Sequence, residues 1–185
     1  MAVKTINTEH LIDLADAIRE KRGITTTLSF PNDFIEYQGG EIENVVAQDL
    51  ASYAFIDSGS FPSGVNRYNM TVDFANNTLR TIITLESSAN INNYVVKLDN
   101  VIVTPEVYDS ANNRYNIDIK DIYAPQFNVT HSISISDGTN TFTRSNLSLL
   151  SYLYGRISSS STNPKMLRLC KAMYIYYLAE IDYFS

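Results

Sequence analysis

Residue types capable of catalysis occur in the sequence without forming a recognisable motif. His10 and His131 lie in different segments, and neither has a cysteine or a second histidine nearby, so their spacing indicates no metal site. Cys170 falls on an apolar helical stripe, where we expect a small buried side chain rather than a reactive thiolate. The sequence contains no G-x-S-x-G elbow, P-loop or G-x-G-x-x-G loop.

Acidic residues and tyrosines offer two further kinds of chemistry. Glu41 and Glu43, and Asp118 and Asp121, are paired acids, and a glycosidase needs two carboxylates across a sugar cleft. We interpret both pairs as solvated acids of loops and strand faces. The 13 tyrosines can stack on sugars or anchor protein interfaces, and we favour core and interface positions. The sequence therefore predicts a protein that is not an enzyme and has no cofactor and no metal site.

Composition and charge limit the classes of partner. The 185 residues carry a net charge of −6, and only 18% of them are charged, so neutral Asn, Ser and Thr side chains must cover much of the surface. Such a surface has no basic patch that would attract nucleic acid or an anionic membrane. We find no run of about 18 apolar residues and no signal peptide, and we expect the chain to fold in the cytoplasm.

Although the sequence has no catalytic motif, its apolar residues are spaced periodically. The first such pattern predicts an amphipathic helix near the start of the chain. Thr8 can cap this helix and Gly23 ends it. Four apolar residues at the spacing i, i+3, i+4, i+7 form its stripe: Leu11, Leu14, Ala15 and Ile18. One narrow stripe does not stabilise a helix alone, so we expect it to dock on the protein's own β domain, a second copy or a particle partner. We favour an attachment or oligomerisation element.

The middle of the chain predicts a β-sandwich. Residues 41–64 are ambiguous in pattern and end in Ser-, Gly- and Pro-rich turn material, so we expect a linker at residues 46–64. From residue 65 to 145, apolar and polar residues alternate in short runs separated by turn clusters, for example Ile133 and Ile135 among serines. This spacing is typical of a small antiparallel, Ig-like sandwich.

Two C-terminal helices complete the predicted architecture. Asn163 and Pro164 are a good cap and first position for the last helix. We expect this helix to pack on the sandwich through one stripe: Met166, Leu169, Cys170, Met173 and Tyr177. The predicted class is α+β, with an N-terminal helical attachment segment (1–45), a linker (46–64) and a β-sandwich with C-terminal helices (65–185).

Two segments carry family resemblances. The first segment resembles an "ADAIR-K-G" helix motif of phage and prophage structural proteins from Firmicutes. The residues that carry this resemblance are Ala15 to Arg19, Lys21 and Gly23, followed by a Thr-rich linker and Phe30-Pro31. Residues 68–184 are similar to a Firmicute surface and prophage module in which a β-sandwich ends in "LSY" and "KALY" helices. The stretches that carry the second resemblance are Tyr115 to Ile119, Ile122 to Ala124, Ser136 to Gly138, Leu150 to Tyr154, Leu169 to Tyr176, and Tyr183-Phe184. Met173 departs from that pattern, which has Leu.

These resemblances imply a structural component of a phage or prophage virion. It would be a tail or baseplate accessory protein, or a capsid decoration or head-fibre protein, made in the host bacterial cytoplasm and located in the virion. Its partners would be other virion proteins and identical copies, bound by multivalent contacts. The alternative is a carbohydrate-binding adhesin module that recognises bacterial envelope glycans. An open, tyrosine-lined groove would favour that alternative.

Overall fold

The computed structural model describes residue 42 and residues 44–184, and the chain divides into two units, residues 1–41 and 42–185. The predicted N-terminal helix, with Leu11, Leu14, Ala15 and Ile18, lies outside the described residues. All of the described residues belong to the second unit. No helix in its described part has the length and apolar character needed to cross a bilayer.

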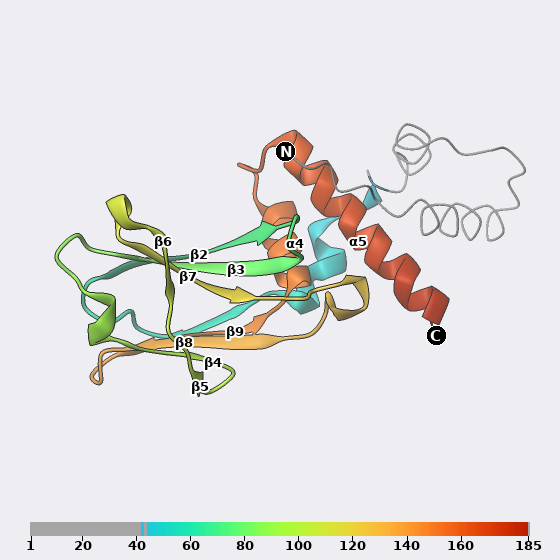
Figure 1. Cartoon of the computed structure of the whole chain (residues 1–185). Helices are drawn as coiled ribbons and strands as arrows, with labels where there is room; N and C mark the ends of the chain where they lie inside the picture. Colours follow the sequence, from blue (N-terminus) through green and yellow to red (C-terminus); the bar gives the residue numbers. More distant parts are fainter. Residues whose placement is uncertain (1–41, 43, 185) are drawn as a thin grey trace, which may run out of the picture. The chain divides into compact units, whose positions relative to one another are not determined.

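Two antiparallel sheets face each other in this unit (Figure 1). The first has five strands, in the spatial order β1 (Ile56–Gly59), β9 (Thr141–Leu147), β8 (His131–Ser136), β4 (Val95–Leu98) and β5 (Val101–Ile102). The second has four strands, in the order β2 (Val65–Asp73), β3 (Thr78–Leu85), β7 (Arg114–Ile119) and β6 (Glu106–Asp109). The β5 and β6 strands are consecutive in the chain, and each is the last strand of its sheet.

Alternating side chains form the core between the sheets. On β8, Ile133 and Ile135 are buried while the intervening serines are partly exposed, which is the pattern expected of a strand with one wet face. On β3, Leu79 and Ile83 are completely buried. Buried side chains from both sheets join those of the C-terminal helices in one hydrophobic cluster. The predicted class, an α+β protein with an antiparallel sandwich and a C-terminal helical pair, is confirmed.

Both C-terminal helices begin at capped positions. Ser148 and Ser151 exchange hydrogen bonds at the start of α4 (Leu149–Ser158), with distances of 2.9 and 3.1 Å between backbone nitrogen and hydroxyl oxygen. The α5 helix (Pro164–Phe184) starts where the Asn163 side chain accepts a 2.9 Å hydrogen bond from the backbone of Lys165. Proline at the first helical position has no amide hydrogen to satisfy, so the predicted start of this helix is correct.

The helical pair covers one end of the sandwich (Figure 1). The α5 helix packs against α4 and against η4 (Ala124–Gln126), a short 3-10 helix that follows β7. The rings of Tyr177 and Phe127 stack there with their centroids 6.2 Å apart. Two further 3-10 helices, η2 (Ile91–Asn93) and η3 (Ser110–Asn112), lie in loops at the opposite end (Figure 1).

The stretch predicted as a linker, residues 46–64, is instead part of the folded unit. It contains η1 (Ala47–Tyr53), which packs against α4, and β1, which pairs with β9 over four residues. Leu50 of η1 is completely buried. The prediction failed because all four β1 residues are exposed, so this strand has no apolar alternation to reveal it.

Candidate interaction surfaces

The predicted stripe of α5 is only partly buried. Cys170 and Tyr177 are in the core, whereas Met166 and Met173 are partly buried against it. Leu169 is 42% exposed, contrary to the predicted packing. Its position differs from that of Cys170 by one residue, or about 100° around the helix, which turns it away from the sandwich. Tyr174, four residues after Cys170, is buried instead and donates a 3.2 Å hydrogen bond to the carbonyl of Asp49.

Cys170 is placed as a structural side chain. Burial raises the pKa of its thiol to about 11, although the positive charge of Arg156 acts in the opposite direction. A thiol with such a pKa is almost fully protonated near neutral pH and is a poor nucleophile. The environment of Cys170 therefore suits packing.

His131 forms a local ion pair with Asp99 in the turn between β4 and β5. The ring Nδ1 lies 2.7 Å from one carboxylate oxygen, and the backbone amide of Ser132 donates to the other oxygen at 2.7 Å. Partial burial opposes ionisation of Asp99, but the hydrogen bonds from His131 and Ser132 outweigh it and lower the pKa of the carboxyl. These contacts join β8 to the β4–β5 turn and account for the position of His131.

Asp118, one of the paired acids, does not show the environment of a general acid. Arg80 donates two hydrogen bonds to Asp118, at 2.8 and 2.7 Å, and Asn116 donates a third at 2.8 Å. The Arg80 hydrogen bonds, against a desolvation penalty, lower the pKa of Asp118, whereas a general acid needs a raised pKa. Glu41 and Glu43 lie outside the described residues. The described part of the chain also holds no group of three potential metal ligands.

An apolar flank lies where the two sheets end. We define the β5–β6 flank as Val101, Ile102, Val107 and Tyr108; the three aliphatic side chains are 66%, 70% and 65% exposed. Within the described residues, β5 pairs with β4 alone and β6 with β7 alone, so backbone donors and acceptors on the other side of each strand have no strand partner there. Exposed aliphatic side chains beside open strand edges are a surface on which another polypeptide can pack.

A second apolar surface belongs to α5. We define the exposed apolar residues of α5 as Leu169, Tyr176, Leu178 and Ile181. They lie on more than one side of the helix, since Leu178 is nine residues, or about 180°, from Leu169. A helix that is apolar on nearly all sides is normally buried on more than one side. The described unit buries one side of α5 and leaves these residues on the surface.

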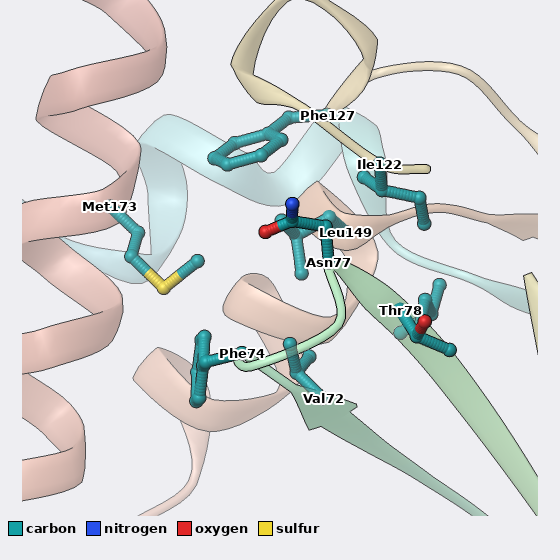
Figure 2. A pocket seen from close by; sticks show the side chains of 9 residues that line it. Val72, Phe74, Asn77, Thr78, Ile122, Phe127, Leu149 and Met173 are labelled. Atoms are coloured by element: carbon teal, nitrogen blue, oxygen red, sulfur yellow. The ribbon is translucent and has the colours of Figure 1, made fainter. Parts of the chain in front are cut away.

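A small apolar hollow lies beside α5, between the β2–β3 turn and the start of α4 (Figure 2). Figure 2 shows Phe74 and Met173 on one side of it, with Phe127 and Ile122 on the other. Its volume of about 50 Å³ is well below the roughly 300–1,000 Å³ of typical small-molecule sites. The hollow is large enough for part of one apolar side chain, not for a metabolite.

A larger polar hollow opens at the opposite end of the sandwich, away from α4 and α5. Its volume is about 460 Å³. Residues from β2, β3, the loop after β3, η3 and β7 line it: Asn66, Thr84, Leu85, Ser87, Ser110, Ala111, Asn112, Asn113 and Arg114. No tyrosine is among these lining residues, so the hollow is not the aromatic groove that the adhesin alternative predicted. Sequence reasoning missed this site because its residues are scattered over 49 positions and have no local motif.

No family model, curated protein or solved structure matches the chain. The class of the described unit is therefore defined by its own architecture, a two-sheet antiparallel sandwich capped at one end by helices. Its surfaces comprise two apolar regions on different elements and one polar hollow.

Proposed function

We propose that this protein is a structural component of a phage or prophage virion, in the tail, the baseplate or the decoration of the head. It acts by multivalent contacts with other virion proteins and with identical copies, and it performs no catalytic step. The proposal rests on the N-terminal "ADAIR-K-G" motif and on one observation from the structure. The described unit has two groups of exposed apolar side chains, the β5–β6 flank and the exposed apolar residues of α5.

Two such surfaces are what a repeated building block requires. A protein that occupies a lattice, ring or fibre must contact at least two neighbours, through different patches if the contact is head-to-tail. Exposed aliphatic groups on edge strands and on a terminal helix provide the non-directional part of such contacts, at about 25 cal/mol for each Å² of apolar surface buried. Open strand edges add directional hydrogen bonds.

The charge distribution is compatible with contacts between copies. The chain has a net charge of −6, which opposes close approach of two copies. From Asn100 to Tyr108, Glu106 is the one charged residue. Two flanks can therefore meet without assembling a large group of like charges.

The test uses purified particles and the full chain. We expect antibodies against the protein to label particles from the lysogen that encodes it, at repeated positions visible by electron microscopy. Ile102→Asp and Leu178→Asp should each reduce incorporation at least tenfold, since each places a charge in an apolar contact. Ser58→Asp, at an exposed position on β1, is the control and should incorporate normally. Particles that contain no trace of the wild-type chain would refute the proposal.

A further inference from the structure

The polar hollow at the end of the sandwich away from α4 and α5 combines many hydrogen-bonding side chains with one charge. Three hydroxyl groups line it, from Thr84, Ser87 and Ser110. Amides of asparagine residues and the guanidinium of Arg114 complete the polar lining. Of the lining residues in the described part of the chain, Arg114 alone carries a charge.

The walls of the hollow are held in place by hydrogen bonds that involve Asn113. This residue adopts a left-handed conformation, with φ of 48°, which ends η3 and starts β7. Its side-chain amide donates to the carbonyls of Glu86 and Ala89, at 2.6 and 2.9 Å. Its own carbonyl accepts a 3.0 Å hydrogen bond from the backbone of Leu85. The loop after β3 and the η3 turn are thereby fixed to each other, so the hollow is formed before any ligand arrives.

The second wall, η3, is fixed at its other end by Asp109. The Asp109 carboxylate accepts hydrogen bonds from the backbone and the side-chain amide of Asn112, at 3.3 and 2.7 Å. The side-chain hydrogen bond from Asn112, only partly opposed by desolvation, is the main reason that the pKa of Asp109 is lowered. Asp109 is therefore ionised near neutral pH, and its carboxylate is largely engaged by η3.

Arg114 retains unused hydrogen-bonding capacity. Its nearest ion-pair contact is 4.0 Å, from Nη1 to Asp109. Its Nε atom is buried and has no hydrogen-bond partner among the described residues. Arginine has five N–H donors in a fixed fork, so most of them remain available. The Arg114 side chain is 41% exposed, so it is the N–H groups on its Nη atoms, rather than the buried Nε, that a ligand in the hollow can reach.

We propose that this polar hollow binds a neutral polyhydroxylated ligand, a saccharide or polyol unit, with Arg114 as the main hydrogen-bond donor. Hydroxyl-rich ligands both donate and accept, which matches a lining of hydroxyls, amides and one guanidinium. The nearby Asp109 carboxylate offsets the charge of Arg114, so the hollow favours a neutral hydroxyl-bearing unit over a free anion. The volume of about 460 Å³ falls within the range of small-molecule sites.

This assignment does not depend on the virion proposal, because binding is measured on the isolated full chain. Two neutral probes distinguish the sources of the ligand: an N-acetylglucosamine tetramer for a saccharide and ribitol for a free polyol. Titration calorimetry and ligand-observed NMR are suited to the weak affinity expected of a shallow site. We expect saturable binding of at least one probe.

Three variants locate the binding. Arg114→Gln should weaken binding at least tenfold, and Ala111→Trp should block it sterically while leaving every polar group in place. Ala111 is exposed, so the larger side chain is compatible with folding, which the melting temperature verifies. Lys165→Gln, an exposed cation at the start of α5, is the matched control and should bind like the wild type. Absence of saturable binding up to about 10 mM of either probe, or equal binding by all the variants, would overturn the assignment.

Discussion

The ion pair between Asp57 and Arg144 joins β1 to β9, and its contribution to the stability of the sandwich can be tested by substitution. Arg144 on β9 donates two hydrogen bonds to Asp57 on β1, at 2.6 and 2.7 Å. Its guanidinium also lies 4.0 Å from the ring centroid of Phe55 and 4.8 Å from that of Tyr68. The two partners differ in burial, because the Arg144 side chain is 10% exposed and the Asp57 side chain 40%.

This asymmetry predicts that loss of the acid is worse than loss of the base. Asp57→Asn leaves a buried guanidinium without its counter-charge. Breaking a fully buried pair costs about 3–5 kcal/mol, and the exposure of Asp57 reduces this to about 2 kcal/mol. Arg144→Met leaves an aspartate that water can solvate and keeps the apolar contact with the rings, so we expect a cost of about 1 kcal/mol. The double variant should be more stable than Asp57→Asn alone.

Urea unfolding followed by circular dichroism measures these free energies. Asp57→Asn should also lower the melting temperature by about 4–8 °C, from a shift of roughly 2–4 °C per kcal/mol for a chain of this size. Ser58→Ala, on the same exposed strand, should change stability by less than about 0.5 kcal/mol. If Arg144→Met destabilises the protein as much as Asp57→Asn does, the pair is not governed by desolvation of the arginine and the reasoning is refuted.

Three further predictions follow from burial and charge. Leu50→Ala should cost about 3 kcal/mol of unfolding free energy, because Leu50 is completely buried, whereas Val46→Ala at an exposed position should cost little; equal costs would contradict the packing of η1. Cys170 should react with a disulfide reagent at pH 8 only after unfolding, since its thiol pKa is about 11 and its side chain is buried; rapid reaction of the native protein would contradict this. The pKa of Asp118 is lowered in the folded state, so the unfolded chain binds more protons at low pH. The stability from this carboxyl is present above its usual pKa of 3.8 and is lost as the pH falls through the folded pKa. The difference in unfolding free energy between the wild type and Asp118→Asn should therefore be constant above that range and should shrink within it; a difference that does not change with pH would contradict this.

Local patterns in the sequence predicted most of the described fold. Alternation identified strands such as β8, where Ile133 and Ile135 are buried, and the Asn163-Pro164 pair located the start of α5. These predictions succeeded because each depends on residues within one element. The β1 strand was missed because it is held by its pairing with β9 and by the Asp57–Arg144 ion pair, both of which join residues far apart in the sequence.

The candidate sites were harder to predict for the same reason. Arg144 follows Phe142 by two residues on β9, so the period of the strand places both on the buried face. That signal indicates a buried charge in need of an acidic partner, although it does not identify Asp57. The polar hollow has no equivalent signal, since β2, β3, η3 and β7 each contribute only a few of its side chains. Leu169 shows that the spacing of apolar residues does not decide which of them are buried. It is next to the buried Cys170 in the sequence, yet it lies on the surface of α5.

The arrangement of these surfaces links the two proposals. The described unit begins with η1, which packs against α4 at the helical end of the sandwich, whereas the polar hollow opens at the other end. In a virion, many copies of this chain would be held in fixed positions. Such copies would bind a repeating polymer with an avidity far above that of one weak site, which is how a polar site of modest affinity becomes effective on a particle. Attachment to a particle and ligand binding by the polar hollow are thus physically compatible, and each can fail without the other.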